Sequence, residues 1–153
     1  MAGALKSVGI IIWPASAVLG LMLAWICVVD FQRFEIPDAA SLGLLIVGLV
    51  FSLTSPLVTP WLALVGAAVA YLAFAALGAV FFQITGQDGL GLGDAKLLGA
   101  AGAWLGPWDL PLLVAVASFG ALAFAALTRQ RRIAFGPWLA GAFWVVWMVR
   151  ISA

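Results

Sequence analysis

Five long stretches of the sequence contain no charged residue, and they constrain the fold more than any other feature. They cover residues 7–29, 39–87, 97–108, 110–128 and 133–149. A helix needs about 20 mostly apolar residues to cross the hydrocarbon core of a bilayer. Only 8% of the residues are charged, whereas a typical soluble domain has about 25%. The sequence therefore predicts a membrane protein with several spanning helices.

The stretch from residue 39 to residue 87 is too long for a single span and must fold back on itself. Pro56 and Pro60, preceded by Ser55 and Thr59, mark the turn. The chain is then expected to be an all-α bundle of about six transmembrane helices that forms one domain, residues 1–153. The predicted spans are residues 8–29, 41–58, 61–84, 93–108, 110–128 and 137–149.

The fourth and sixth predicted spans are short. As helices they would measure about 24 and 20 Å, against a hydrocarbon core of about 30 Å. Either they are tucked among longer neighbours, or one of them is re-entrant.

Composition also excludes several classes of function. The seven basic and six acidic residues nearly cancel, so the chain has no net field to attract a nucleic acid. Cys27 is the single cysteine and the chain has no histidine. An internal disulfide and a histidine-based or multi-cysteine metal site are therefore excluded, and we expect no metal and no cofactor.

The basic residues predict the orientation in the membrane. The loops near residues 30–40, 85–96 and 129–136 hold five of the seven: Arg33, Lys96, Arg129, Arg131 and Arg132. The positive-inside rule places these three loops in the cytoplasm and both termini outside. Three tryptophans are then expected near the outer interface, where indole rings settle: Trp61, Trp104 and Trp108.

The acidic residues gather in or beside two of these cytoplasmic loops. Five of the six lie there: Asp30, Glu35, Asp38, Asp88 and Asp94. Asp30 closes the first predicted span and Asp94 opens the fourth, so both are expected near the inner face. Two carboxyl groups brought close together can share a proton, one activating water while the other polarises a carbonyl. That is the chemistry of an aspartic protease, which needs neither a metal nor a histidine.

Three glycines alternate with other residues directly before Asp94: Gly89, Gly91 and Gly93. Glycine permits positive φ or the close approach of an extended peptide, so we expect Gly91 and Gly93 to admit a substrate backbone. A phosphate-binding loop would end in Gly-Lys-Ser or Gly-Lys-Thr, which is absent here.

Three segments resemble those of a known family. They are residues 30–38 (DFQRFEIPD), residues 91–106 (GLGDAKLLGAAGAWLG) and residues 134–137 (AFGP). In this order on a six-span chain, they are similar to the type IV prepilin peptidases, which are bacterial inner-membrane aspartic proteases of the GxGD class. The resemblance extends from Asp30 to about Gly141.

This resemblance implies that Asp30 and Asp94 are the catalytic pair. It also implies a function as an intramembrane aspartic endopeptidase that removes a short basic leader from a prepilin or pseudopilin, after a glycine, at the cytoplasmic face. The larger family members carry an N-terminal region with Cys-x-x-Cys motifs and also methylate the new N-terminus. With only Cys27, the chain looks like the short, peptidase-only form found with tight-adherence (Flp-type) pili.

Several of these residues also have simpler structural readings. Asp94 would serve as the N-cap of its helix, and Asp30 would pair with Arg33 one turn later. We prefer catalysis for both. Asp38 is interpreted as the N-cap of the second span, and Lys96 as a helix-end lysine that reaches toward the interface.

Glu35 and Asp88 have no structural role in this scheme, and we expect them to attract the basic leader. Phe135, Gly136 and Pro137 are expected to set the turn into the last span. The alternatives to a prepilin peptidase are an archaeal-type preflagellin peptidase and a non-catalytic membrane subunit or small transporter. The expected partners are the pilin substrate and membrane lipid, whereas the sequence does not specify the oligomeric state.

Overall fold

The structure is a computed structural model of the 153-residue chain. It describes residues 2–33, 36–86, 91–128 and 134–152, and only the backbone of residues 2–9. Within these ranges the chain forms six α-helices and no strand. The helices are α1 (Ala2–Arg33), α2 (Asp38–Thr54), α3 (Pro60–Thr85), α4 (Leu92–Leu105), α5 (Leu110–Thr128) and α6 (Gly136–Ser152).

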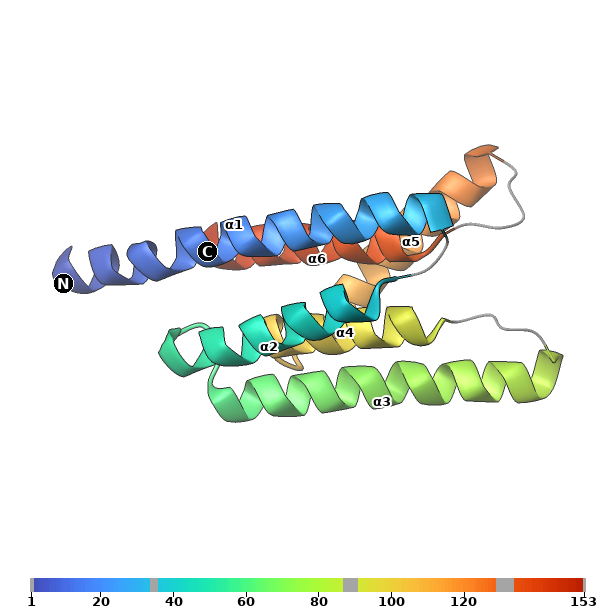
Figure 1. The fold of residues 1–153 in the computed structure, drawn as a ribbon, viewed down its shortest axis with the longest axis horizontal. Coiled ribbons are helices and arrows are strands. Elements are labelled where there is room, and N and C mark those ends of the chain that lie inside the picture. Colours follow the sequence, from blue (N-terminus) through green and yellow to red (C-terminus); the bar gives the residue numbers. More distant parts are fainter. Residues whose placement is uncertain (1, 34–35, 87–90, 129–133, 153) are drawn as a thin grey trace.

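Consecutive helices run in opposite directions along one bundle (Figure 1). Helices α1, α3 and α5 end, and α2, α4 and α6 begin, at the same end of the bundle, which we call the Asp94 end. The opposite end, which we call the Arg150 end, holds the turns at residues 55–59 and 106–109. This arrangement confirms the predicted six-helix bundle.

The proline-rich segment forms the turn that the sequence predicts. Helix α2 ends at Thr54, and the Leu57 N–H donates a hydrogen bond to Ser55 Oγ at 3.1 Å. Pro60 lies in the first turn of α3, where its missing N–H costs nothing. The predicted second span was therefore too long, because its last four residues, 55–58, belong to this turn.

Three helices are long and apolar enough to cross a bilayer: Ile10–Arg33 within α1, Pro60–Thr85 and Leu110–Thr128. Helix α2 is a shorter apolar helix, and α4 has only 14 residues. Every residue of α4 from Leu97 to Leu105 is buried. It packs against α2, α3, α5 and α6, so this short helix is tucked among its neighbours.

Small residues let α3 and α4 approach each other closely. A Cβ atom added to Gly66 would lie 2.5 Å from the Gly102 carbonyl oxygen, well inside a normal contact. Such contacts between small residues are a common way for helices to associate in a membrane. The stretch of small residues in α4 is thus used to bring the two backbones together.

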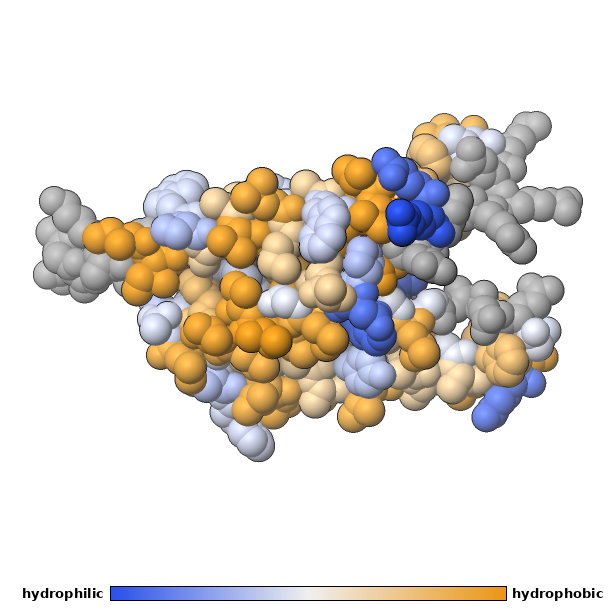
Figure 2. All heavy atoms as spheres, in the orientation of Figure 1, coloured by the Kyte–Doolittle hydropathy of each residue, from blue (hydrophilic) through white to orange (hydrophobic). Residues whose placement is uncertain are grey.

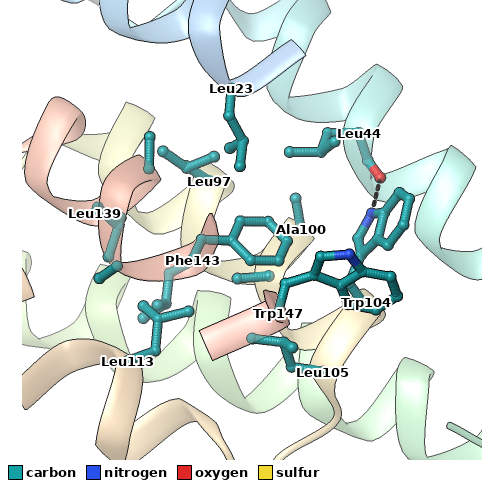
Figure 3. Close-up of a cluster of buried hydrophobic side chains, with 14 of the residues drawn as sticks. Leu23, Leu44, Leu97, Ala100, Trp104, Leu105, Leu113, Leu139, Phe143 and Trp147 are labelled. Carbon is teal, nitrogen blue, oxygen red and sulfur yellow. Dashed lines mark hydrogen bonds between the residues drawn. The ribbon is translucent and has the colours of Figure 1, made fainter. Parts of the chain in front are cut away.

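Aromatic side chains fill the core between α2, α4 and α6 (Figure 3). Trp104 and Trp147 are fully buried and meet edge to face, with ring centroids 5.3 Å apart. Trp104 Nε1 donates to the Leu44 carbonyl oxygen at 2.9 Å, which ties α4 to α2. The prediction that Trp104 lies at the outer interface was therefore wrong, whereas Trp61, at the start of α3, and Trp108, in the turn between α4 and α5, are exposed.

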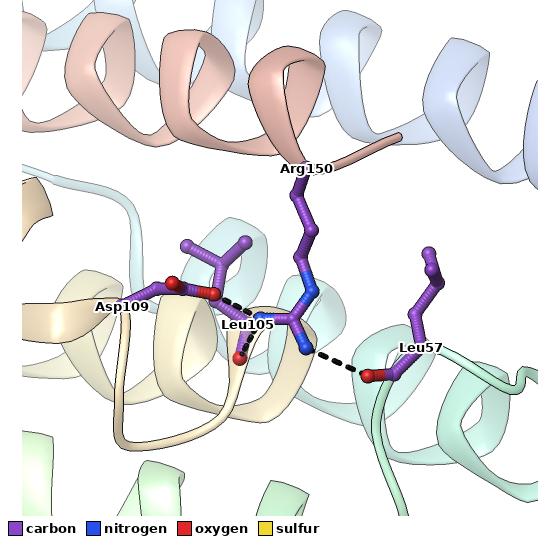
Figure 4. A network of polar contacts seen from close by, with 4 residues as sticks. All are labelled: Leu57, Leu105, Asp109 and Arg150. Atoms are coloured by element: carbon purple, nitrogen blue, oxygen red, sulfur yellow. Dashed lines mark hydrogen bonds and ion pairs between the residues drawn. The ribbon is translucent and has the colours of Figure 1, made fainter. Parts of the chain in front are cut away.

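At the Arg150 end, one guanidinium group holds two turns together (Figure 4). Arg150, in the last turn of α6, donates from Nη2 to the Leu57 carbonyl oxygen at 2.7 Å. Its Nη1 donates to the Leu105 carbonyl oxygen at 2.6 Å and forms an ion pair with Asp109. Arg150 therefore links α6 to both turns at this end.

The outer surface of the bundle is largely apolar. Figure 2 shows apolar residues over most of the visible face, with hydrophilic residues gathered toward the Asp94 end. Large side chains such as Leu21, Leu72 and Phe119 are exposed on three different helices. A surface of this kind is expected where lipid, rather than water, surrounds the helices. The chain is a membrane protein.

Candidate active site

The three segments singled out from the sequence meet at the Asp94 end, and Ile36 lies between two of them. A Cβ atom added to Gly93, at the start of α4, would lie 3.0 Å from Ile36 Cβ. A Cβ atom added to Gly136, at the start of α6, would lie 3.0 Å from Ile36 Cδ1. Because both glycines lack a side chain, the residue before Pro37 fits closely against the first turns of two helices.

Asp30 is buried within the last turn of α1. Helix α1 continues to Arg33, beyond the predicted end at residue 29, so Asp30 is held by helical backbone on both sides. Its relative exposure is 4%, and the Gly136 backbone amide interacts with its carboxyl group. Among the described residues, its Oδ2 is the one buried side-chain polar atom without a hydrogen-bond partner.

The simpler reading of Asp30 was wrong. Arg33 is exposed, and among the described ion pairs none joins it to Asp30. Asp30 is instead directed into the bundle, toward Gly136 of α6. A buried carboxyl that is neither paired nor fully hydrogen-bonded is costly, and at membrane depth such groups are functional candidates by default.

Asp94 lies in the first turn of α4 and is partly buried. The N-cap of this helix is Gly91, which has no side chain to cap it, so the reading of Asp94 as the N-cap was wrong. Asp94 is three residues further on, and its carboxyl group accepts a backbone hydrogen bond from Gly91. This is the half of a capping box in which the third helical residue reaches back to the N-cap amide.

The structure brings the two carboxyl groups together from α1 and α4, 64 residues apart in the sequence. Asp30 acts electrostatically on Asp94, and both groups are withdrawn from water. Two like charges oppose each other, which is the condition under which two carboxyl groups can share a proton. One carboxylate and one carboxylic acid side by side can act as base and acid in a single step.

Gly91 and Gly93 serve different purposes in this arrangement. Gly91 is exposed with φ −67°, a conformation open to any residue. Gly93 lies within α4, where Ile36 packs on it. The close approach at Gly93 is therefore made mainly by the side chain of this chain's own Ile36. Neither glycine has the positive φ considered from the sequence; among the described glycines this occurs at Gly86 and Gly106.

Asp38 and Lys96 form an ion pair that the sequence analysis did not anticipate. Pro37, not Asp38, is the N-cap of α2, so the capping role assigned to Asp38 was wrong. Lys96 Nζ lies 2.6 Å from Asp38 Oδ1. Lys96 therefore reaches across to the first turn of α2.

The remaining predicted positions include Glu35 and Asp88, which lie outside the described residues, as do Arg129, Arg131 and Arg132. Gly136, which the sequence indicates only as part of a turn, lies against the Asp30 carboxyl group. The signal that could have identified Gly136 is its place directly before the first-turn proline of a helix. There, a free backbone amide and the lack of a side chain let a neighbouring group come close. Within the part of the chain that the structure describes, no three potential metal ligands cluster.

Comparison with known proteins shows which family the sequence resembles. Residues 17–126, which include Asp30 and Asp94, match the type IV leader peptidase family. A protein of Pectobacterium carotovorum subsp. carotovorum named prepilin leader peptidase/N-methyltransferase is 40% identical over 146 residues, covering 91% of this chain and 52% of the relative.

Proteins of the same name from Escherichia coli K12 and Neisseria gonorrhoeae are also similar. The first is 38% identical, covering 80% of this chain and 60% of the relative, and the second is 36% identical, covering 88% and 48%. The chain thus spans about half the length of the curated relatives it matches. No solved structure matches it significantly. Because the family model matches most of the chain, and relatives 36–40% identical cover 80–91% of it, the chain belongs to the type IV leader peptidase family.

Proposed function

We propose that this chain is an intramembrane aspartic endopeptidase that removes the short basic leader from a prepilin or pseudopilin, with Asp30 and Asp94 as its catalytic pair. The observation that carries the proposal is the buried Asp30 carboxyl, which lies within electrostatic reach of Asp94 and has one oxygen without a partner. A fold under no functional demand would satisfy or replace such a group.

The reaction is peptide hydrolysis by water. The ionised carboxyl of the pair takes a proton from water as the oxygen attacks the scissile carbonyl carbon, while the protonated carboxyl donates its proton to the carbonyl oxygen. The tetrahedral intermediate collapses when the C–N bond breaks and the leaving nitrogen receives the proton held by the first carboxyl. One hydroxyl group of the intermediate returns its proton to the second carboxyl as the new C=O bond forms, which restores the pair. The products are a leader with a new carboxyl group and a pilin with a new amino group.

Gly91 and Gly93 are the proposed contacts of the substrate backbone next to the pair. Gly91 is exposed at the start of α4, beside Asp94. Glu35 and Asp88 are proposed to attract the basic leader. With no metal or cofactor in the scheme, a chelator should leave cleavage unchanged.

The proposed location is the bacterial inner membrane, with the Asp94 end facing the cytoplasm and both termini facing the periplasm. Arg33 and Lys96 belong to the Asp94 end, and five of the seven basic residues fall in or beside the three loops predicted there. The positive-inside rule supports this orientation. It also presents the pair to a leader on the cytoplasmic side.

Co-expression with a candidate prepilin tests the proposal. The wild-type chain should produce the shortened pilin, whereas Asp30→Asn and Asp94→Asn should leave the precursor intact while inserting into the membrane normally. Asp109→Asn is the matched control, because Asp109 is an acidic residue at the Arg150 end. Cleavage retained by either catalytic-pair variant, or lost in the Asp109 variant at equal expression, contradicts the assignment.

A further inference from the structure

The two carboxyl groups of the pair belong to different groups of packed helices. Asp30 is on α1, which packs mainly against α6 and more lightly against α2. Asp94 is on α4, which packs most closely against α3 and α2. The relative position of the carboxyl groups therefore depends on how these two groups of helices are held together at the Asp94 end.

At the Arg150 end, residues 106–109 connect the two groups through α5, which packs against α6. At the Asp94 end, the covalent link is the segment between α1 and α2. It leaves α1 one turn after Asp30 and enters α2 at Asp38. Between these points Ile36 packs against Gly93 of α4 and Gly136 of α6. Where Ile36 sits thus affects both the helix that carries Asp94 and the glycine that contacts Asp30.

The Lys96–Asp38 ion pair lies at the downstream end of this link, and its side chains are 28% and 63% exposed. Lys96 follows Asp94 by two residues, and Asp38 follows Ile36 by two residues. Their side chains meet at 2.6 Å and join α4, just after its first turn, to the first turn of α2. Deeper in the bundle, the Trp104–Leu44 hydrogen bond joins the same two helices. The ion pair is therefore the polar tie between α2 and α4 that lies next to the site.

We infer that Lys96 and Asp38 form a positioning pair for catalysis: their ion pair docks the Ile36 segment on α4 and so sets the placement of Asp94 relative to Asp30. This inference rests on the proposed function. Lys96 is not expected to contact substrate, because its ammonium group is engaged by Asp38 and the proposed leader is itself basic. Neither residue takes part in the chemical step.

Steady-state cleavage of a purified prepilin by the full chain in detergent or vesicles tests the inference. Lys96→Met and Asp38→Asn should each lower kcat by about 10- to 100-fold, because displacements of about 1 Å at a reacting pair cost rates of this order. KM should change by less than kcat. The charge-swapped double variant, Lys96→Glu with Asp38→Lys, should recover most of the lost kcat, since it restores an ion pair between the same two helices.

Asp109→Asn is the matched control, because it breaks the other described ion pair, at the Arg150 end, and should leave kcat unchanged. Three results would overturn the inference: unchanged kcat in both single variants, a charge-swapped variant no more active than either single one, or an effect confined to KM. The last two would indicate that Lys96 meets the substrate directly. If the wild-type chain leaves the prepilin intact, the proposed function fails first, and this inference fails with it.

Discussion

Adding one methyl group at Gly136 should displace the buried carboxyl of Asp30. The Cβ of a Gly136→Ala variant would lie 2.5 Å from Asp30 Oδ2 and 3.0 Å from Asp30 Cγ, where ordinary contacts begin at 3.4 Å. The added Cβ would also lie 3.0 Å from Ile36 Cδ1, so it cannot move away from Asp30 toward Ile36. The oxygen must therefore move by about 0.9 Å, unless α6 shifts instead.

The size of this shift sets the expected effect. A displacement of about 1 Å in a reacting group costs on the order of 100-fold in rate. Overpacking of a filled site costs about 1–3 kcal/mol of stability. We therefore expect Gly136→Ala to lower kcat by about 100-fold with a smaller change in KM, in a protein that remains folded. The assay is steady-state cleavage in detergent, with thermal unfolding followed through tryptophan fluorescence.

Gly141→Ala supplies the matched control on the same helix. A Cβ atom at Gly141 would meet nothing within 4 Å. Alanine in place of glycine within a helix is normally favourable by about 0.5–1 kcal/mol. This variant should therefore keep its kcat and unfold no earlier than the wild type. Wild-type kcat in Gly136→Ala, or an equal loss in both variants, would refute the reasoning.

Three further predictions concern other parts of the chain. Arg150→Met should lower the free energy of unfolding by about 3 kcal/mol, because it removes hydrogen bonds from a charged donor to Leu57 and Leu105 and leaves Asp109 unpaired. Thermal unfolding measures this loss, and kcat of the folded protein should not change. In a Cys27→Ser background, cysteines placed near residues 35, 87 and 131 should react with a membrane-impermeant reagent only from the cytoplasmic side. A cysteine in place of Thr59 should react only from the periplasmic side, and the reversed pattern would refute the proposed orientation. Glu35→Gln and Asp88→Asn should raise KM several-fold with little change in kcat, and by less in high salt, because the proposed role of these charges is to attract the leader and not to react. A loss confined to kcat would contradict this role.

The number and order of the helices were predictable because charged residues and prolines mark where a membrane-spanning chain must turn. Pro56 and Pro60 located one turn correctly. The exact helix ends were not predictable, because a helix ends where its hydrogen bonding stops rather than where apolar residues stop. Helix α1 accordingly continues to Arg33, past the apolar run that ends at Val29.

Asp30 and Asp94 could be singled out as candidates because each stands next to an apolar span, where a charge is costly without a purpose. Their surroundings were not predictable in the same way. Lys96 and Asp38 are 58 residues apart in the sequence, and neither segment alone indicates that they meet. The prediction for Trp104 was wrong because a tryptophan near the end of a helix can lie either at the membrane interface or at the edge of the protein core. The hydrogen bond to Leu44 that decides between them comes from another helix.

The most direct test of the central claim is a double-mutant cycle on the cleavage rate of the purified, reconstituted chain. Four proteins are compared: the wild type, Asp30→Asn, Asp94→Asn and the double variant. If the two carboxyl groups act as one unit, each single substitution should reduce kcat as far as the double substitution does, to the background of uncatalysed cleavage. Single variants that each keep measurable activity, with losses that multiply in the double variant, would show that the two residues act independently and would contradict a catalytic pair.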